Sequence, residues 1–327
     1  MLARIANDLY WLGRHLVRAE HTARMLDALF QAELDHWSEH PSSVRISWRS
    51  IPLLMGASPG EAEVVEDDAR ETVTRQLTTD ERNAVSIVSC VSAAREEART
   101  LRDTISTEMW ESLNTFFLEL QKPDLGGRPR TGPHSVYAFV RERCALFWGL
   151  SLSTMQRDEA RSFLVAGGRV EAADMVLRML RVALPPVRPA DDATKELPRR
   201  DGNALALLRA VGGLQAFMRS QAAPPNAEPV AHFLLVEADF PESVAASAEA
   251  LHRSLARADR DPQASPPVLR LRRLLADLEL RRHSTVPYDE LPAAFREIQQ
   301  ELGLVEREID AHYFFREAAP EGSLVVQ

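Results

Sequence analysis

Cysteine, glycine and aromatic residues are scarce in this chain of 327 residues, which has 2 Cys, 14 Gly and only 6% Phe, Trp and Tyr. Cys90 and Cys144 lie far apart in helical patterns, so we expect two buried free thiols in a reducing cytoplasm and not a disulfide framework. The glycine-rich phosphate loops, the Gly-x-Ser-x-Gly nucleophile motif and the Cys-x-x-Cys pair are missing. The sequence therefore lacks the motifs that mark the common nucleotide-binding, hydrolase and disulfide-exchange families.

Long apolar runs and basic blocks are missing as well. No run of about 18 apolar residues occurs, so we expect no membrane-spanning helix. Residues 1–8 already read as amphipathic helix and lack the apolar block of a signal peptide. The net charge is -9 and the arginines are scattered, which argues against nucleic-acid binding. We expect a cytoplasmic protein that binds neither membrane nor nucleic acid.

Helical periodicity dominates what is present. From Leu2 to about Trp37, apolar residues recur every three or four positions. Gly13 lies inside this helix at a cost of about 1 kcal/mol relative to Ala, which indicates a close approach by another helix. The best strand-like run, 232–236, has helical neighbours and is interpreted as a short buried helix. The predicted fold class is all-α, with a solvated loop at 185–202 and a helix at 203–220.

Two stretches of the chain resemble each other. Residues 13–26 align without gaps on 167–180, at an offset of 154 positions. Ser86 and Ser243, each followed by an apolar residue and a helix, repeat at an offset of 157. Coincidental helical periodicity is the alternative explanation. We predict a duplicated helical bundle of two pseudo-symmetric halves in one compact unit. The predicted divisions are a first half at 1–125, a second half at 134–317 and a flexible tail at 318–327.

Arginines and acids share helical faces in several places. Arg14 and Arg18 are four positions apart, and a second set of arginines follows an i, i+4, i+7 pattern from Arg95. Together they would form a pocket for a carboxylate or phosphate, because the guanidinium fork matches such groups. We favour the alternative, a structural ion-pair network, because buried charges are normally paired. The candidate residues are Arg14, Arg18, Glu20, Arg95, Glu96, Arg99, Arg102, Asp103, Glu108, Asn114 and Glu171.

Glu-x-x-His pairs, which hold di-iron centres in some helical bundles, occur at Glu33/His36 and Glu249/His252. Two such pairs are unremarkable for a chain with 9 His and this acidic content. His36 also lies at the end of its helix. We therefore expect no metal site and no cofactor.

Residues 10–26 resemble the opening of the Alpha-E proteins, a bacterial all-helical family named for a Glu-Arg signature. The shared pattern is Tyr-Trp-Leu-Gly-Arg-x-x-x-Arg-Ala-Glu-x-Thr-Ala-Arg-x-Leu. Residues 83–114 are similar to the second block of the family, and the likeness extends weakly along the full chain.

The chain departs from the family at the signature itself, which is divided between the two proposed halves. The first copy reads Val17-Arg18 and the second reads Glu171-Ala172. If the helices that contain residues 13–26 and 167–180 face each other, the loss of one Glu together with the opposing Arg keeps the buried charge balanced. We therefore predict that Arg18 is mostly buried and forms a salt bridge with Glu171. The other candidate acids for Arg18 are Glu96, Asp103 and Glu108.

The resemblance implies an association with circularly permuted ATP-grasp amide ligases, and with transglutaminase-like and proteasome-like proteins. Our hypothesis is an accessory protein or partner of an ATP-grasp carboxylate–amine ligase in a system that makes or modifies peptides. No recognisable catalytic set is present, so a non-catalytic role is favoured. The alternative is an enzyme that acts on a peptide or amino-acid adduct through an Arg/Glu-lined pocket. A metal-binding helical bundle is a minor alternative.

Overall fold

The structure, a computed structural model, describes residues 1–36, 48, 51, 69–122, 134–185, 193–221, 224–284 and 286–314. Within these ranges, the side chains of 32–36 and 193–199 are left undescribed. The predicted all-α class is confirmed, because the described residues form α-helices and no strands. None of the helices described is long and apolar enough to cross a bilayer.

The first helices of the chain lie on one side of the molecule. The first helix covers nearly the predicted range, and Ser86 and Ser106 cap the helices that follow them by accepting a backbone N–H. The bounds are α1 Ala3–His36, α3 Ala69–Thr78, α4 Ile87–Thr100, α5 Thr107–Leu120 and α6 His134–Thr154.

The later helices begin with α7, Glu159–Ala183, which is buried on nearly every side. Most of its residues are small or apolar, as expected for a helix enclosed by others, and its buried acids Glu171 and Asp174 are paired with arginines. The remaining bounds are α8 Ala193–Ala210, α9 Leu214–Ser220, α10 Ala227–Val236, α11 Val244–Ala258, α12 Pro266–Arg282 and α13 Leu291–Ile309, with a 3₁₀ turn at Tyr288–Glu290 and a π-helical turn at Asp310–Phe314.

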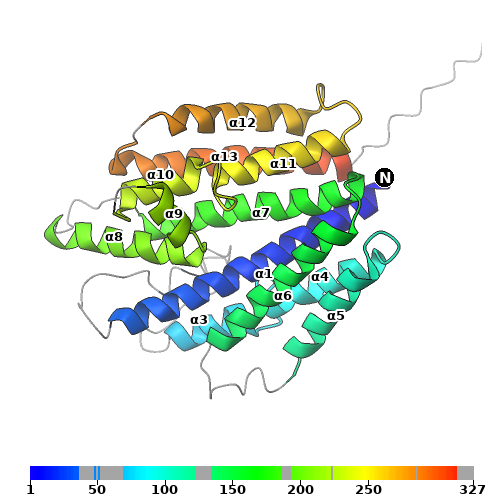
Figure 1. The fold of residues 1–327 in the computed structure, drawn as a ribbon, viewed down its shortest axis with the longest axis horizontal. Helices are drawn as coiled ribbons and strands as arrows, with labels where there is room; N and C mark the ends of the chain where they lie inside the picture. Colours follow the sequence, from blue (N-terminus) through cyan, green and yellow to red (C-terminus); the bar gives the residue numbers. More distant parts are fainter. Residues whose placement is uncertain are drawn as a thin grey trace, which may run out of the picture.

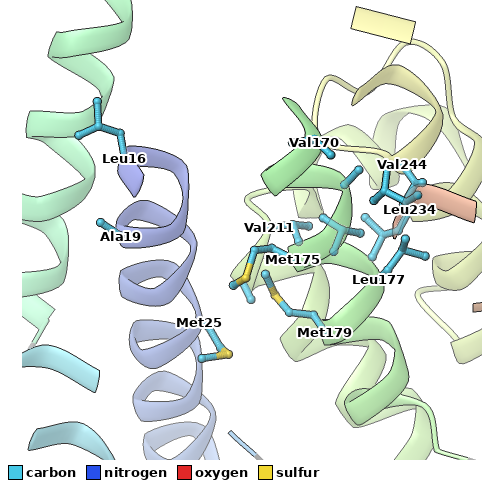
Figure 2. Packing of buried hydrophobic residues seen from close by; sticks show 14 of the residues in the cluster. Leu16, Ala19, Met25, Val170, Met175, Leu177, Met179, Val211, Leu234 and Val244 are labelled. Carbon is cyan, nitrogen blue, oxygen red and sulfur yellow. The ribbon is translucent and has the colours of Figure 1, made fainter. Parts of the chain in front are cut away.

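The helices α1 and α7 form the centre of the molecule. Figure 1 shows them side by side, with α4 and α6 packed on α1 and with α11 and α13 packed on α7, while α5 and α12 lie farther out. The buried side chains of the two helices are part of one hydrophobic core. In Figure 2, Met25 of α1 is directed toward Met179 of α7, and both line one small cavity. The core therefore joins the two sets of helices.

Glycines allow α1 and α7 to touch backbone to backbone. A Cβ atom on Gly13 would lie 2.1 Å from the carbonyl oxygen of Leu164, and one on Gly167 would lie 1.8 Å from that of Tyr10. No side chain fits either place, so the predicted close approach at Gly13 is confirmed. The two contacts are reciprocal, because each glycine meets the residue three positions before the other.

The serine-capped helices α4 and α11 have similar settings. Each comes directly after a ten-residue helix, α3 or α10, although α8 and α9 separate α7 from α10 along the chain. Ser86 accepts from the N–H of Ser89, and Ser243 accepts from the N–H of Ala246. The next two helices pack in the same sequence, α5 with α6 and α12 with α13.

The predicted loop at 185–202 is wrong over its second part, because α8 begins at Ala193. Ala, Lys, Glu and Leu in this stretch are strong helix formers and outweigh the prolines that suggested a loop. The helix predicted at 203–220 is also interrupted. Gly212 has φ of +69°, and the N–H of Gly213 bonds the carbonyl of Leu208, which ends α8 in a Schellman turn before α9 begins.

Candidate functional site

The contact between α1 and α7 brings charged side chains from opposite ends of the sequence together. Arg14 and Arg18 lie one turn apart on α1 and meet Glu171, one turn beyond Gly167 on α7. Glu306 reaches the same place from α13. We call Arg14, Arg18, Glu171 and Glu306 the buried ion cluster.

Glu171 is the centre of the buried ion cluster and is only 1% exposed. Its Oε1 accepts from Nε of Arg18 at 2.5 Å, and its Oε2 accepts from Nη2 of Arg18 at 2.9 Å and from Nε of Arg14 at 2.8 Å. The predicted salt bridge between Arg18 and Glu171 is confirmed, and 18% of the Arg18 side chain is exposed. The acid, however, is shared by two arginines, which the sequence comparison did not indicate.

Arg14 connects Glu171 to the last helix. Its Nη1 donates to Oε2 of Glu306 at 3.2 Å, and its guanidinium group lies 4.8 Å from the ring centre of Trp11. The guanidinium is therefore held by two carboxylates and by the face of an aromatic ring. Since Arg14 is 7% exposed, little of its charge is left to water.

The ion pairs decide the charge state of Glu171. Burial alone would raise the pKa of this carboxyl, but Arg14 and Arg18 outweigh burial and lower the pKa to about 2. The same contacts keep both guanidinium groups charged, because Glu171 raises their pKa values against the opposing effect of burial. The centre of the cluster is thus ionised at neutral pH.

The edge of the cluster behaves differently. Burial raises the pKa of Glu306 and of Asp310, and Arg14 only partly opposes this effect. The hydroxyl of Tyr10 is buried beside them and has no hydrogen-bond partner among the described residues. Burial also raises the pKa of this phenol. Titratable groups therefore extend from the cluster toward the end of α13.

A pocket of about 990 Å³ opens at that end of the molecule. Asp310 belongs both to the lining of the pocket and to the surroundings of Arg14. Its wall also contains Asp259, which accepts from Tyr313 at 2.8 Å and lies 3.0 Å from His312. The lining includes Glu159, Asp259, Arg260, Arg307, Asp310 and His312. A polar ligand placed here would come close to the buried ion cluster.

The other predicted arginines form a separate group, with Arg95 and Arg99 on α4 and Arg102 in the turn before α5. Nε of Arg95 donates to Oδ1 of Asn114 at 2.9 Å, and Glu96 accepts from Arg95 and from Arg99. Arg102 stacks on the ring of Trp110 at 4.1 Å. These contacts join α4 to α5 near the surface. The structure does not bring them together with Arg14 and Arg18 into one cationic pocket.

The remaining candidates lie outside the buried ion cluster. Glu20 pairs with Arg24, one turn along α1, at 2.6 Å. Asp103 and Glu108 are exposed, so neither is the acid that binds Arg18. The suggested role of these residues in binding a ligand stays a prediction.

Thiols and metal ligands offer no reactive centre in the described part of the chain. Burial raises the pKa of Cys90 to about 12 and that of Cys144 well above its usual value, so both are protonated at neutral pH. Among the described residues, no three His, Cys, Asp or Glu side chains converge as metal ligands. Glu249 pairs with Arg253, and the side chains of Glu33 and His36 lie outside the described residues.

Glu306, Asp310 and Tyr10 are the members of this region that sequence reasoning missed. Glu306 lies 292 positions from Arg14, and no local pattern connects the two. The amphipathic periodicity of 291–309 places Glu306 next to the buried Val305, which is the one feature that marks it as partly enclosed.

Comparison with known proteins gives one match. A family model described as a predicted alpha-helical domain with a conserved ER motif matches residues 1–314. No curated protein and no solved structure matches the chain.

Proposed function

The chain belongs to the Alpha-E family, and we propose that it is a non-catalytic partner of an ATP-grasp carboxylate–amine ligase in a peptide-synthesis or peptide-modification system. The proposal takes the ligase from the association that the family resemblance implies. It places the protein in the cytoplasm, where such a ligase finds its ATP.

The proposed non-catalytic role rests on one observation: the Glu and the Arg of the signature bind each other. Both oxygens of Glu171 accept from guanidinium groups, and the side chain is buried. A general base needs access to its substrate and a pKa near the working pH, whereas Glu171 is buried beneath two guanidinium groups and has a pKa of about 2. The signature pair then serves to hold α1 against α7.

We further propose that the chain is a duplicated unit. The first copy would comprise α1, α3, α4, α5 and α6, and the second α7, α10, α11, α12 and α13. The reciprocal glycine contacts and the equivalent serine caps support this view. So do the pairs Glu20–Arg24 and Asp174–Arg178, which occupy matching positions of α1 and α7. In this division α6, which packs against α1 and α5, belongs to the first copy, so the proposed boundary lies after α6 and not before residue 134 as the sequence pattern predicted.

A second candidate function is favoured by the pocket beside Asp310. It is large enough for a small peptide or amino-acid adduct, at about 990 Å³, and it carries both acids and arginines. Asp310 has a pKa raised by burial, as a general acid or base requires. The alternative is thus an enzyme that processes such an adduct in this pocket.

The test combines co-purification with an activity assay. The tagged protein is expressed with the ATP-grasp ligase of the same organism, and ADP release and amide formation are measured with and without it. We expect the ligase to co-purify and amide formation to rise when the protein is added. Absence of both effects would refute the partner role.

The enzyme alternative is separated by assaying the protein alone. In that case Asp310→Asn would abolish turnover of the amide product, whereas the exposed control Asp103→Asn would not. If the protein enhances the ligase and the Asp310→Asn variant does so equally, the non-catalytic role stands.

A further inference from the structure

Another pocket lies between the start of α7 and the last turns of α11, apart from the buried ion cluster. Its volume is about 200 Å³, and arginines dominate its wall. The residues that matter here are Arg157, Asp158, Arg161, Arg253 and Arg257, and we call this site the arginine pocket.

The arginine pocket carries an excess of positive charge in an acidic protein. Its four guanidinium groups are accompanied by the carboxylates of Asp158, in the wall, and Glu249, which pairs with Arg253 at 3.1 Å. Asp158 is also engaged as the cap of α7, where it accepts from the backbone N–H of Arg161. Two positive charges are left over, whereas the chain as a whole has a net charge of -9.

Arg161 is the partly enclosed member of this group, whereas Arg157, Arg253 and Arg257 are exposed at the rim. Its Nε is buried and has no hydrogen-bond partner among the described residues. Burial lowers the pKa of its guanidinium, and repulsion from Arg157 and Arg257 lowers it further. Buried donors are normally bonded, and like charges are normally kept apart.

The backbone adds to this charge. Arg157 and Arg161 flank the start of α7, a helix of 25 residues whose N-terminus carries the positive end of its dipole. Arginine is disfavoured there for the same reason that an anion is favoured. An arrangement that repels itself when empty and is completed by an anion is typical of a binding site.

We propose that the arginine pocket binds a phosphoryl group, either as inorganic phosphate or as the end of a larger ligand. A phosphate dianion matches the two surplus positive charges, and its oxygens suit several guanidinium donors at once. The volume of about 200 Å³ accommodates such a group but leaves the rest of a nucleotide outside. The proposal is independent of the role as a ligase partner.

The experiment measures phosphate binding by titration calorimetry on the full chain at low ionic strength. We expect Arg161→Gln and Arg257→Gln each to weaken the affinity for inorganic phosphate by about tenfold or more, because each removes a charged donor. Arg282→Gln, on α12 and paired with Glu279, serves as the matched control and is expected to bind as the parent does. Absence of phosphate binding, or equal binding by all variants, would overturn the proposal.

Thermal stability is the second measurement, and here Arg161→Gln should stabilise the protein without phosphate although it weakens phosphate binding. In buffer without phosphate, Arg161→Gln is expected to melt at or above the temperature of the parent, because it relieves the repulsion. Added phosphate is expected to raise the melting temperature of the parent and not that of Arg161→Gln, at ionic strength matched with sodium chloride. A variant that melts low without phosphate and still gains from it would show that Arg161 is structural and refute the site.

Competition identifies the source of the phosphoryl group. If ADP displaces inorganic phosphate and binds more tightly, the group belongs to a larger ligand; if ADP is no better, free phosphate is the ligand. Binding of a short poly-glutamate peptide in place of phosphate would mean that the pocket recognises carboxylates of an acidic protein segment, and the phosphoryl assignment would be wrong.

Discussion

Removing Glu171 is the change that most directly tests the role of the buried ion cluster. Glu171→Ala takes the shared acid away from Arg14 and Arg18, and Arg14 is left 7% exposed with only Glu306 to neutralise it. Arg18→Ala is milder, because Glu171 keeps its bond to Arg14 at 2.8 Å. The two variants and their combination form a double-mutant cycle.

The structure sets the order of the effects. Breaking a buried ion pair from one side costs about 3–5 kcal/mol, and we expect Glu171→Ala in this range. Arg18→Ala, with 18% of the side chain exposed and an acid that stays paired, should cost about 1–3 kcal/mol. The double variant should cost less than the sum of the singles by about 0.5–3 kcal/mol.

Urea denaturation followed by circular dichroism measures each free energy of unfolding, and unchanged m-values show that the compared states are the same. The matched control is the pair Glu20–Arg24 on the same helix, which is also an arginine–carboxylate contact but lies nearer the surface, with 15% and 30% of the side chains exposed. The coupling free energy of this control pair should be only about 0.3–0.5 kcal/mol. Additive effects of Arg18→Ala and Glu171→Ala, or equal costs for the two single variants, would refute the shared-acid account.

Three further predictions concern backbone contact and titration. Gly167→Ala should lower the free energy of unfolding by about 3 kcal/mol or more in denaturation experiments, because its Cβ would lie 1.8 Å from a backbone oxygen. The control is Gly149→Ala in α6, whose Cβ would meet nothing within 4 Å. This variant should gain up to about 1 kcal/mol of stability from helix propensity. Equal effects of the two would contradict the close contact. The pKa of Glu171 falls from 4.5 to about 2 on folding, so the stability that its charge contributes is complete above this range and is lost as the pH drops through it. When the free energy of unfolding is measured at decreasing pH, Glu171→Gln should therefore lose less stability than the parent protein. Burial raises the pKa of Asp310, so the folded state disfavours its ionised form, and thermal melts should show Asp310→Asn gaining stability at neutral pH relative to its effect in acid. The same difference at both pH values would mean that Asp310 does not titrate in a buried setting.

The pattern of residues along the chain was enough to predict the first helix and its close contact with another helix. The apolar stripe from Leu2 to about Trp37 predicted α1 to within a residue at each end, and Gly13 predicted the close approach of another helix. The salt bridge between Arg18 and Glu171 followed from the alignment of two distant stretches. These features are repeated or periodic, so a single sequence contains them.

Other features depend on which surfaces meet in three dimensions, and no spacing along the chain records that. Arg95 was grouped with Arg14 because both lie on helical faces with other arginines, yet Arg95 faces Asn114 on α5. Glu306 joins Arg14 only because α13 packs on α7. The start of α8 was predicted as a loop because this stretch is rich in proline, although it also contains a run of good helix formers.

The pairing of α1 with α7 also has a consequence for how the protein is made. The acid that neutralises Arg18 lies 153 positions downstream, and the one that completes the surroundings of Arg14 lies 292 positions downstream. At a synthesis rate of about 5–20 residues per second, α1 leaves the ribosome about 8–30 s before its partner helix. During this interval α4 and α6 are available to pack on α1, but its two arginines lack Glu171 and Glu306 and its face toward α7 lacks its native partner. The part of the core between α1 and α7 therefore forms only after α7 has been made, and the surroundings of Arg14 are completed only near the end of translation.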